Sequence, residues 1–197
     1  MMLAILAQST GPILLIIVVA AIVVAVLWAV AAYNGLIRMR NQVRNAWSQI
    51  DVQLRRRWDL IPNLVQTVKG YTQHERETLE KVTEARTQAQ QAAGQGVAKQ
   101  AEAESGLSGA LSRLMVVVES YPDLKANQNY LALQEELTST ENKIGFARQF
   151  YNDQVMKFNS MIEVFPRNII ANMFNFDRAD FFELEESAAR EAPKVEF

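Results

Sequence analysis

The 197-residue sequence has no cysteine and a single histidine, His74. The absence of cysteine excludes disulfides, thiolate nucleophiles and cysteine-ligated metal or iron–sulfur centres, and one histidine cannot form a two-histidine metal site within one chain. Glycine and proline are also scarce, with 8 and 5 residues. Because both residues interrupt helices and the sequence is rich in Ala, Gln, Glu and Leu, the composition predicts an all-α protein.

The sequence also lacks an excess of charge of either sign, since its formal net charge is −2. No segment combines clustered Lys and Arg with aromatic residues, so we expect no nucleic-acid partner. His74-Glu75 is not followed by a second histidine one turn later, and Glu135-Glu136 stands without a nucleophile or a glycine-rich phosphate loop. We interpret both as surface charge and expect no enzymatic activity, no metal and no cofactor.

An uncharged apolar run covers residues 13–32. About 20 residues in a helix are enough to cross a hydrocarbon core of roughly 30 Å. We therefore predict a transmembrane helix over residues 12–33, preceded by a short extracytoplasmic tail at residues 1–11. The alternative is a cleaved secretory signal ending near Ala29-Val30-Ala31, but no basic residue precedes the run, and the run is longer than a usual signal core.

Three arginines, Arg38, Arg40 and Arg44, follow the apolar run before the first acidic residue, Asp51, and no charge precedes the run. The positive-inside rule then places the N-terminus outside and the C-terminal domain in the cytoplasm, as a single-pass protein. These arginines also provide a membrane-proximal basic cluster that attracts anionic lipid headgroups at roughly 1 kcal/mol each.

Apolar residues recur at intervals of three and four through residues 34–165, which predicts a cytoplasmic helical bundle. The first soluble helix should continue the transmembrane helix and end near Asp59, because Pro62 disfavours helical geometry at Ile61. We expect a tight antiparallel hairpin there, and the alternative is one continuous, kinked helix. The second helix should run from Asn63 to about Ala93.

Gly94 and Gly96 predict a loop after the second helix. A third helix should then end at Tyr121-Pro122, and a fourth should run from about Ala126 to Phe165 with coiled-coil-like packing. Short connections between four helices imply an up-and-down four-helix bundle, whose last helix returns toward the membrane.

The segment 166–182 is apolar and departs from the helical periodicity. Seven of its residues are candidate oligomer or membrane contacts: Ile169, Ile170, Met173, Phe174, Phe176, Phe181 and Phe182. One interpretation is that they fold back on their own bundle, and the other is that they contact the membrane interface or a second subunit. The remaining residues, 183–197, are acidic and predict a mobile tail.

Arg57 lies on or beside the inward stripe of the first soluble helix when the apolar positions are counted by heptads. A buried guanidinium needs an acidic partner, because an unpaired buried charge costs several kcal/mol. We therefore predict a buried polar cluster of Arg57 with Asp51, Asp59 and Glu141 as candidate partners. In the alternative, the stem of Arg57 packs and its head reaches water.

Several motifs resemble those of one known family. They are Tyr33-Asn34-Gly35-Leu36, Ala46-Trp47-Ser48-Gln49-Ile50-Asp51-Val52-Gln53-Leu54, Asp59-Leu60-Ile61-Pro62-Asn63-Leu64-Val65, Thr67-Val68-Lys69-Gly70-Tyr71, Ala85-Arg86, Leu133-Gln134-Glu135-Glu136-Leu137, Tyr151-Asn152 and Phe165-Pro166. With them the chain resembles the LemA family from the apolar run to Phe182. The resemblance implies a bacterial inner-membrane protein with a helical bundle, a cytoplasmic C-terminus and no established enzymatic activity.

The resemblance also suggests what such a protein does. One branch of the family, the magnetosome proteins MamQ, is associated with shaping the inner membrane, and family genes often lie beside those of membrane metalloproteases. Neither association fixes the activity of this chain. The long membrane-rooted helix, the absence of a catalytic constellation and the apolar C-terminal segment lead us to expect a non-enzymatic scaffold that forms a homo-oligomer and organises or shapes the membrane or its partner proteins, with membrane lipids as partners. The alternative is a regulatory adaptor or sensor of a membrane protein partner such as a metalloprotease.

Overall fold

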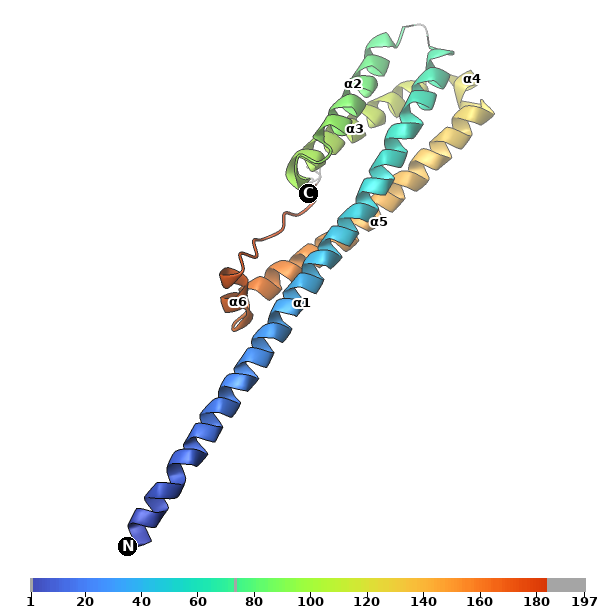
Figure 1. The fold of residues 1–197 in the computed structure, drawn as a ribbon. Helices are drawn as coiled ribbons and strands as arrows, with labels where there is room; N and C mark the ends of the chain where they lie inside the picture. The colour runs from blue at the N-terminus through green and yellow to red at the C-terminus, as the bar shows by residue number, and fades with distance from the viewer. Residues whose placement is uncertain (1, 73, 184–197) are drawn as a thin grey trace, which may run out of the picture. The chain divides into compact units, whose positions relative to one another are not determined.

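The computed structural model describes residues 2–72 and 74–183, with side chains described from residue 13 onward. Within these ranges every regular element is a helix: α1 (Met2–Lys69), α2 (Arg76–Ala92), α3 (Val97–Val118), α4 (Pro122–Lys125), α5 (Gln128–Glu163) and α6 (Arg167–Met173) (Figure 1). The all-α prediction is confirmed. The up-and-down order of a four-helix bundle stays a prediction, and the acidic tail lies outside the described residues from position 184 onward.

Helix α1 is one continuous helix of 68 residues. It contains one apolar stretch long enough to cross a membrane, with a mean hydropathy of 3.4 over 18 residues and none of those residues buried in the protein. The expected hairpin at Pro62 is wrong, because α1 passes through this residue and ends only at Lys69. Gly70 and Tyr71 then form the turn that begins the connection to α2.

The chain tolerates Pro62 inside α1 because the lost hydrogen bond has a substitute. A proline has no N–H to donate to the carbonyl four residues earlier, which here belongs to Trp58. The Arg86 side chain of α2 donates its Nε–H to that carbonyl oxygen at 2.7 Å. The Pro62 ring itself is exposed on the surface, where it displaces no core residue.

The chain forms two compact units. The first comprises residues 2–42 and 156–179, and so includes the apolar part of α1, the end of α5 and α6. In this unit the Tyr33 ring lies 4.7 Å from that of Phe174, and Phe158 meets Phe176 at 6.5 Å between ring centroids. Asn159 of α5 holds the extended backbone at Ala179, donating to its carbonyl and accepting from its N–H, both at 2.9 Å.

The second unit comprises residues 43–155 and 180–183 among those described. Its core is formed by apolar side chains spaced by three or four residues on α1, α2, α3 and α5: Ile50, Leu54, Ile61, Leu64, Val68, Leu79, Val82, Leu107, Leu111, Leu114, Leu137, Ile144 and Tyr151. Gly94 and Gly96 connect α2 to α3 with φ angles of 79° and 106°. These left-handed conformations favour glycine, and they turn the chain where the sequence indicates a loop.

Candidate functional site

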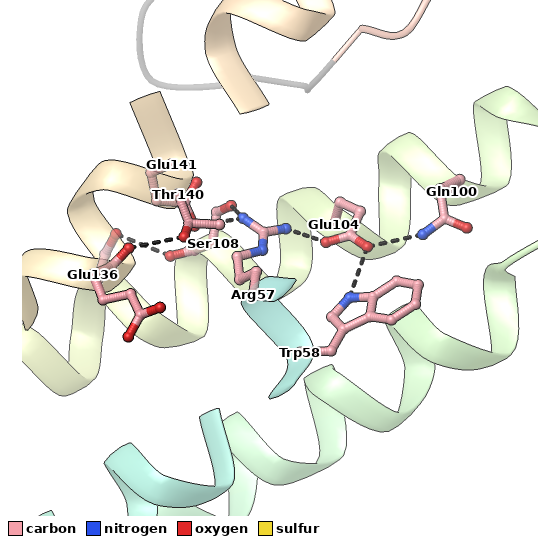
Figure 2. A network of polar contacts seen from close by, with 9 residues as sticks. Arg57, Trp58, Gln100, Glu104, Ser108, Glu136, Thr140 and Glu141 are labelled. Carbon is pink, nitrogen blue, oxygen red and sulfur yellow. Dashed lines mark hydrogen bonds and ion pairs between the residues drawn. The ribbon is translucent and has the colours of Figure 1, made fainter. Parts of the chain in front are cut away.

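The most distinctive group of polar side chains in the second unit surrounds Arg57. Its inward position on α1 follows from the helical repeat that also buries Leu54 and Ile61, and the residue is 1% exposed. Its Nη1 donates to Ser108 Oγ of α3 at 3.0 Å and to Glu141 Oε1 of α5 at 2.7 Å, and its Nη2 donates to Glu104 of α3 (Figure 2). One guanidinium therefore joins three helices.

Glu104 is the second centre of this network and is also 1% exposed. Besides the bond from Arg57, its Oε1 accepts a hydrogen bond from Trp58 Nε1 at 3.0 Å and one from Gln100 Nε2 at 2.8 Å (Figure 2). Gln100 Nε2 also donates to the carbonyl of Ala89 in α2 at 3.3 Å. The carboxylate thus has donors on both oxygens and links α1, α3 and, through Gln100, α2.

The charges of this network suit a structural role. Two charges removed from water are stable only when they pair closely and their other hydrogen-bonding positions are filled. Arg57 and Glu104 meet most of this condition in the core: the two charges pair closely and both Nη atoms of Arg57 donate, while Arg57 Nε has no partner. The second carboxylate, Glu141, keeps 39% of its side chain exposed. Glu104 accepts three hydrogen bonds from its neighbours and is closed to solvent, so a substrate in solution cannot reach it to transfer a proton. The network suits a role in setting the register of α1, α3 and α5, and that role stays a prediction.

The sequence expectation for this cluster included two residues that lie elsewhere. Glu141 pairs with Arg57, but Asp51 pairs with Arg55 one turn along the surface of α1, at 2.8 Å. Asp59 is exposed. Both aspartates differ from Arg57 in helical phase, because separations of six and two residues point to other sides of a helix.

Glu104, which the sequence reasoning missed, carried a readable signal. It stands three residues before Leu107 and seven before Leu111, in phase with the buried stripe of α3. A charged residue at such a position predicts a buried partner of opposite charge. The sequence interpretation passed over Glu104 because the preceding residues are rich in Ala and Gln and show little apolar periodicity.

A second cluster in this unit holds the end of the described chain. Phe182 is 1% exposed, and its ring centroid lies 5.5 Å from that of Trp47 in α1, which meets Tyr151 of α5 at 5.4 Å. Asn152 accepts the N–H of Phe182 at 2.9 Å and donates to its carbonyl at 3.2 Å. Tyr151 donates its hydroxyl to the carbonyl of Asp180 at 2.8 Å. We call Trp47, Tyr151 and Asn152 the Phe182 docking site.

The environment of Tyr151 also changes its acidity. Burial, and then the charge of Asp180, raise the pKa of the Tyr151 phenol to about 12. The hydroxyl therefore remains a hydrogen-bond donor to the Asp180 carbonyl at all physiological pH values.

The remaining candidate residues are distributed as follows. Arg38 and Arg44 are exposed, whereas the guanidinium carbon of Arg40 lies 5.0 Å from the ring centroid of Phe176. Of the candidate oligomer or membrane contacts, the buried ones are Ile170, Phe176 and Phe182, and the exposed ones are Ile169, Met173, Phe174 and Phe181. The segment thus divides between packing on its own unit and apolar groups that face outward.

No group of three His, Cys, Asp or Glu side chains that could hold a metal ion occurs within residues 13–72 and 74–183. His74 is exposed. The polar side chains around Arg57 are largely paired with one another, and Arg57 Nε is the guanidinium nitrogen that lacks a hydrogen-bond partner there.

Comparison with known proteins connects this arrangement to one family. Protein LemA of Metamycoplasma hominis is 29% identical over 153 residues, which cover 78% of this chain and 69% of that protein. Magnetosome protein MamQ 2 of Paramagnetospirillum magneticum is 26% identical, covering 94% of this chain and 77% of its own length. Magnetosome protein MamQ of Magnetospirillum gryphiswaldense is 24% identical over 95% of this chain and 78% of its own. The model of the LemA family matches residues 46–197, and the chain belongs to this family.

Proposed function

We propose that this protein is a membrane-anchored, non-enzymatic scaffold that self-assembles and organises or shapes the bacterial inner membrane. The observation that carries the proposal is the change in environment along α1. The aliphatic side chains of residues 13–19 are all more than half exposed, whereas Leu36, Ile50 and Leu54 of the same helix are at most 1% exposed. A run of exposed aliphatic residues is unfavourable in water and favourable in a bilayer.

The charges beside this run support an orientation. Arg38 and Arg44 are exposed on α1 shortly after the apolar stretch, where cations retain a helix end on the cytoplasmic side. The second unit is then held in the cytoplasm close to anionic lipid headgroups. The similarity to proteins named for the magnetosome supports a role for this chain at a bacterial membrane.

An exposed aromatic surface supports self-assembly. Phe146 and Phe150 of α5 are 74% and 46% exposed, and Val52 of α1 is 60% exposed. These three residues line one shallow groove between α1 and α5. Contiguous apolar side chains exposed on a surface are typical of an interaction site, whereas single exposed apolar residues are not.

The test is reconstitution of the full chain into vesicles of phosphatidylethanolamine and phosphatidylglycerol. Flotation on a density gradient should carry the protein with the lipid, and native mass measurement in mild detergent should show oligomers. A Val18→Lys, Ile22→Lys variant should lose flotation, because each lysine at a helix centre costs about 3 kcal/mol in the bilayer. Asn45→Lys, on the exposed side of α1 beyond the span, is the matched control.

Two results would contradict the proposal. Flotation unchanged by the two lysines would show that α1 is not the anchor. A strict monomer at every protein density in the vesicles would exclude the scaffold, and a stable complex with a different membrane protein would favour the adaptor instead.

A further inference from the structure

The contacts made by residues 180–182 resemble those of a bound peptide. The chain from Phe176 to Glu183 has no helix or strand structure. Asn152 contacts both the N–H and the carbonyl of Phe182, and Tyr151 contacts the carbonyl of Asp180. Backbone groups of an extended segment are thus bound as they are in peptide-recognition sites, where main-chain hydrogen bonds give affinity and one side chain gives specificity.

Only one side chain of this segment is deeply held. Phe182 is 1% exposed against Trp47 and Tyr151, whereas its neighbour Phe181 is 40% exposed. The docked element therefore has a single aromatic anchor and three backbone hydrogen bonds. The second unit resumes at Asp180 after Ala179, so the docked element is the first part of that second stretch of the unit.

Such an element fits the same site on another molecule equally well. A second copy of this chain offers an identical Asp180–Phe182 segment, so exchange between copies preserves the contacts that residues 180–182 make with the docking site, and exchange of an identical element is a low-cost route to dimers. Copies anchored in one bilayer through α1 are confined to a plane, and this confinement raises the effective concentration of a neighbour's segment.

We propose that the Phe182 docking site exchanges its occupant, binding the 180–182 segment of a second copy when copies meet in the membrane. The inference rests on the proposed function, because it names the contact through which anchored copies join. The ligand of the site is an extended peptide with one phenylalanine anchor, supplied by this chain itself.

The absence of cysteine makes a direct test available. Asp153 and Phe181 are exposed and adjoin the hydrogen-bonded pair Asn152 and Phe182. Full chains carrying both Asp153→Cys and Phe181→Cys are prepared with natural and with heavy nitrogen, mixed in equal amounts during reconstitution into vesicles, and treated with a short bismaleimide. Mass spectrometry then reports whether the two crosslinked peptides carry the same isotope or different ones.

Complete exchange with random partners predicts that about half of the crosslinks join different isotopes. This fraction should rise with protein density in the vesicle. Adding Phe182→Ala should reduce mixed crosslinks several-fold, and Asn152→Asp, which keeps the acceptor for the Phe182 N–H and loses the donor, should give an intermediate value. A chain ending after Glu183 keeps the anchor and should behave as the full chain, which separates the effect of residues 184–197.

Crosslinks that join only peptides of the same isotope at every density would overturn the inference. If native mass still showed oligomers in that case, the scaffold proposal would stand and another surface would join the copies. If the protein were also a strict monomer, both proposals would fail. Circular dichroism of each variant confirms that helix content is retained before crosslinks are compared.

Discussion

Arg57 and Glu104 are each 1% exposed, and among the described residues Arg57 is the cation that pairs with Glu104, whereas Arg57 also pairs with the partly exposed Glu141. A pair of this kind contributes little net stability when intact, because its desolvation offsets much of its attraction. Its value lies in specificity: only one register of α1 and α3 brings guanidinium and carboxylate together.

Replacing Arg57 by alanine should therefore destabilise the protein strongly. It leaves Glu104 buried without its cation, and we expect the free energy of unfolding to fall by about 3–5 kcal/mol. Chemical denaturation of the full chain in mild detergent, followed by circular dichroism, measures the change. Arg56→Ala is the matched control, since the neighbouring Arg56 pairs with Glu136 at the exposed surface and such pairs contribute about 1 kcal/mol or less.

The double variant Arg57→Met, Glu104→Met separates the cost of the lone charge from the cost of lost packing. We expect it to recover part of the stability lost in Arg57→Ala, because no lone charge remains in the core, whereas Trp58 Nε1 and Gln100 Nε2 lose their acceptor. Equal losses in Arg57→Ala and Arg56→Ala would contradict the interpretation of the network.

Tyr151 gives a pH-dependent prediction. Its pKa is about 12 in the folded protein and near 10 when unperturbed, so the folded state holds the phenolic proton more tightly. The resulting contribution to stability is complete below pH 10 and is lost as pH rises toward about 12. Denaturant titrations across this window should show a steeper fall for the natural sequence than for Tyr151→Phe, and parallel curves would refute the assignment.

At the scale of the element, α1 receives a hydrogen bond from α2 where Pro62 interrupts its own backbone hydrogen bonding. Pro62 leaves the Trp58 carbonyl without its normal donor, and Arg86 of α2 supplies one at 2.7 Å. The continuity of α1 at Pro62 therefore depends on a side chain of another helix, α2.

This arrangement predicts energetic coupling between Pro62 and Arg86. Arg86→Ala should cost about 1–3 kcal/mol, because it leaves a carbonyl beside the core unsatisfied. In a Pro62→Ala background the restored N–H of residue 62 bonds that carbonyl, and the cost of Arg86→Ala should fall below about 1 kcal/mol. A double-mutant cycle in denaturant measures the coupling, and additive effects of the two substitutions would contradict it.

At the scale of the whole molecule, one helix, α1, contains both the apolar stretch and the residues that it contributes to the core of the second unit. In the proposed topology, the cations that follow the apolar run decide which side of the membrane receives the second unit. Arg40 also stacks on Phe176, so it is unsuited to a test of charge alone.

Replacing Arg38 and Arg44 by glutamate while keeping Arg40 should weaken insertion or invert the orientation, because the positive-inside bias is largely removed. Protease accessibility of the C-terminal region in spheroplasts and in inverted membrane vesicles reports the orientation. The matched change Arg55→Glu, on the exposed side of α1 farther from the span, should leave it as it is. Identical protection patterns for all three proteins would refute the charge-based orientation.

Helical class, the apolar run, the loop at Gly94 and Gly96 and the inward phase of Arg57 were all accessible from the sequence, because each depends on local composition or on the 3.6-residue repeat. Helix propensity also predicts a break at Pro62, and here local reasoning failed. The break is prevented by Arg86, which is 24 positions away in the chain and close only after folding.

What the sequence by itself determined is therefore the list of elements and which face of each is apolar, since both follow from residue spacing. Only the tertiary structure decided that Glu104 is the buried partner of Arg57, that Asp51 and Asp59 are not, and that Asn152 holds the backbone of Phe182. The physical reason is that helical phase places a side chain on a face, whereas its partner depends on the register between helices, which is set by packing and by the cost of leaving a buried charge unpaired.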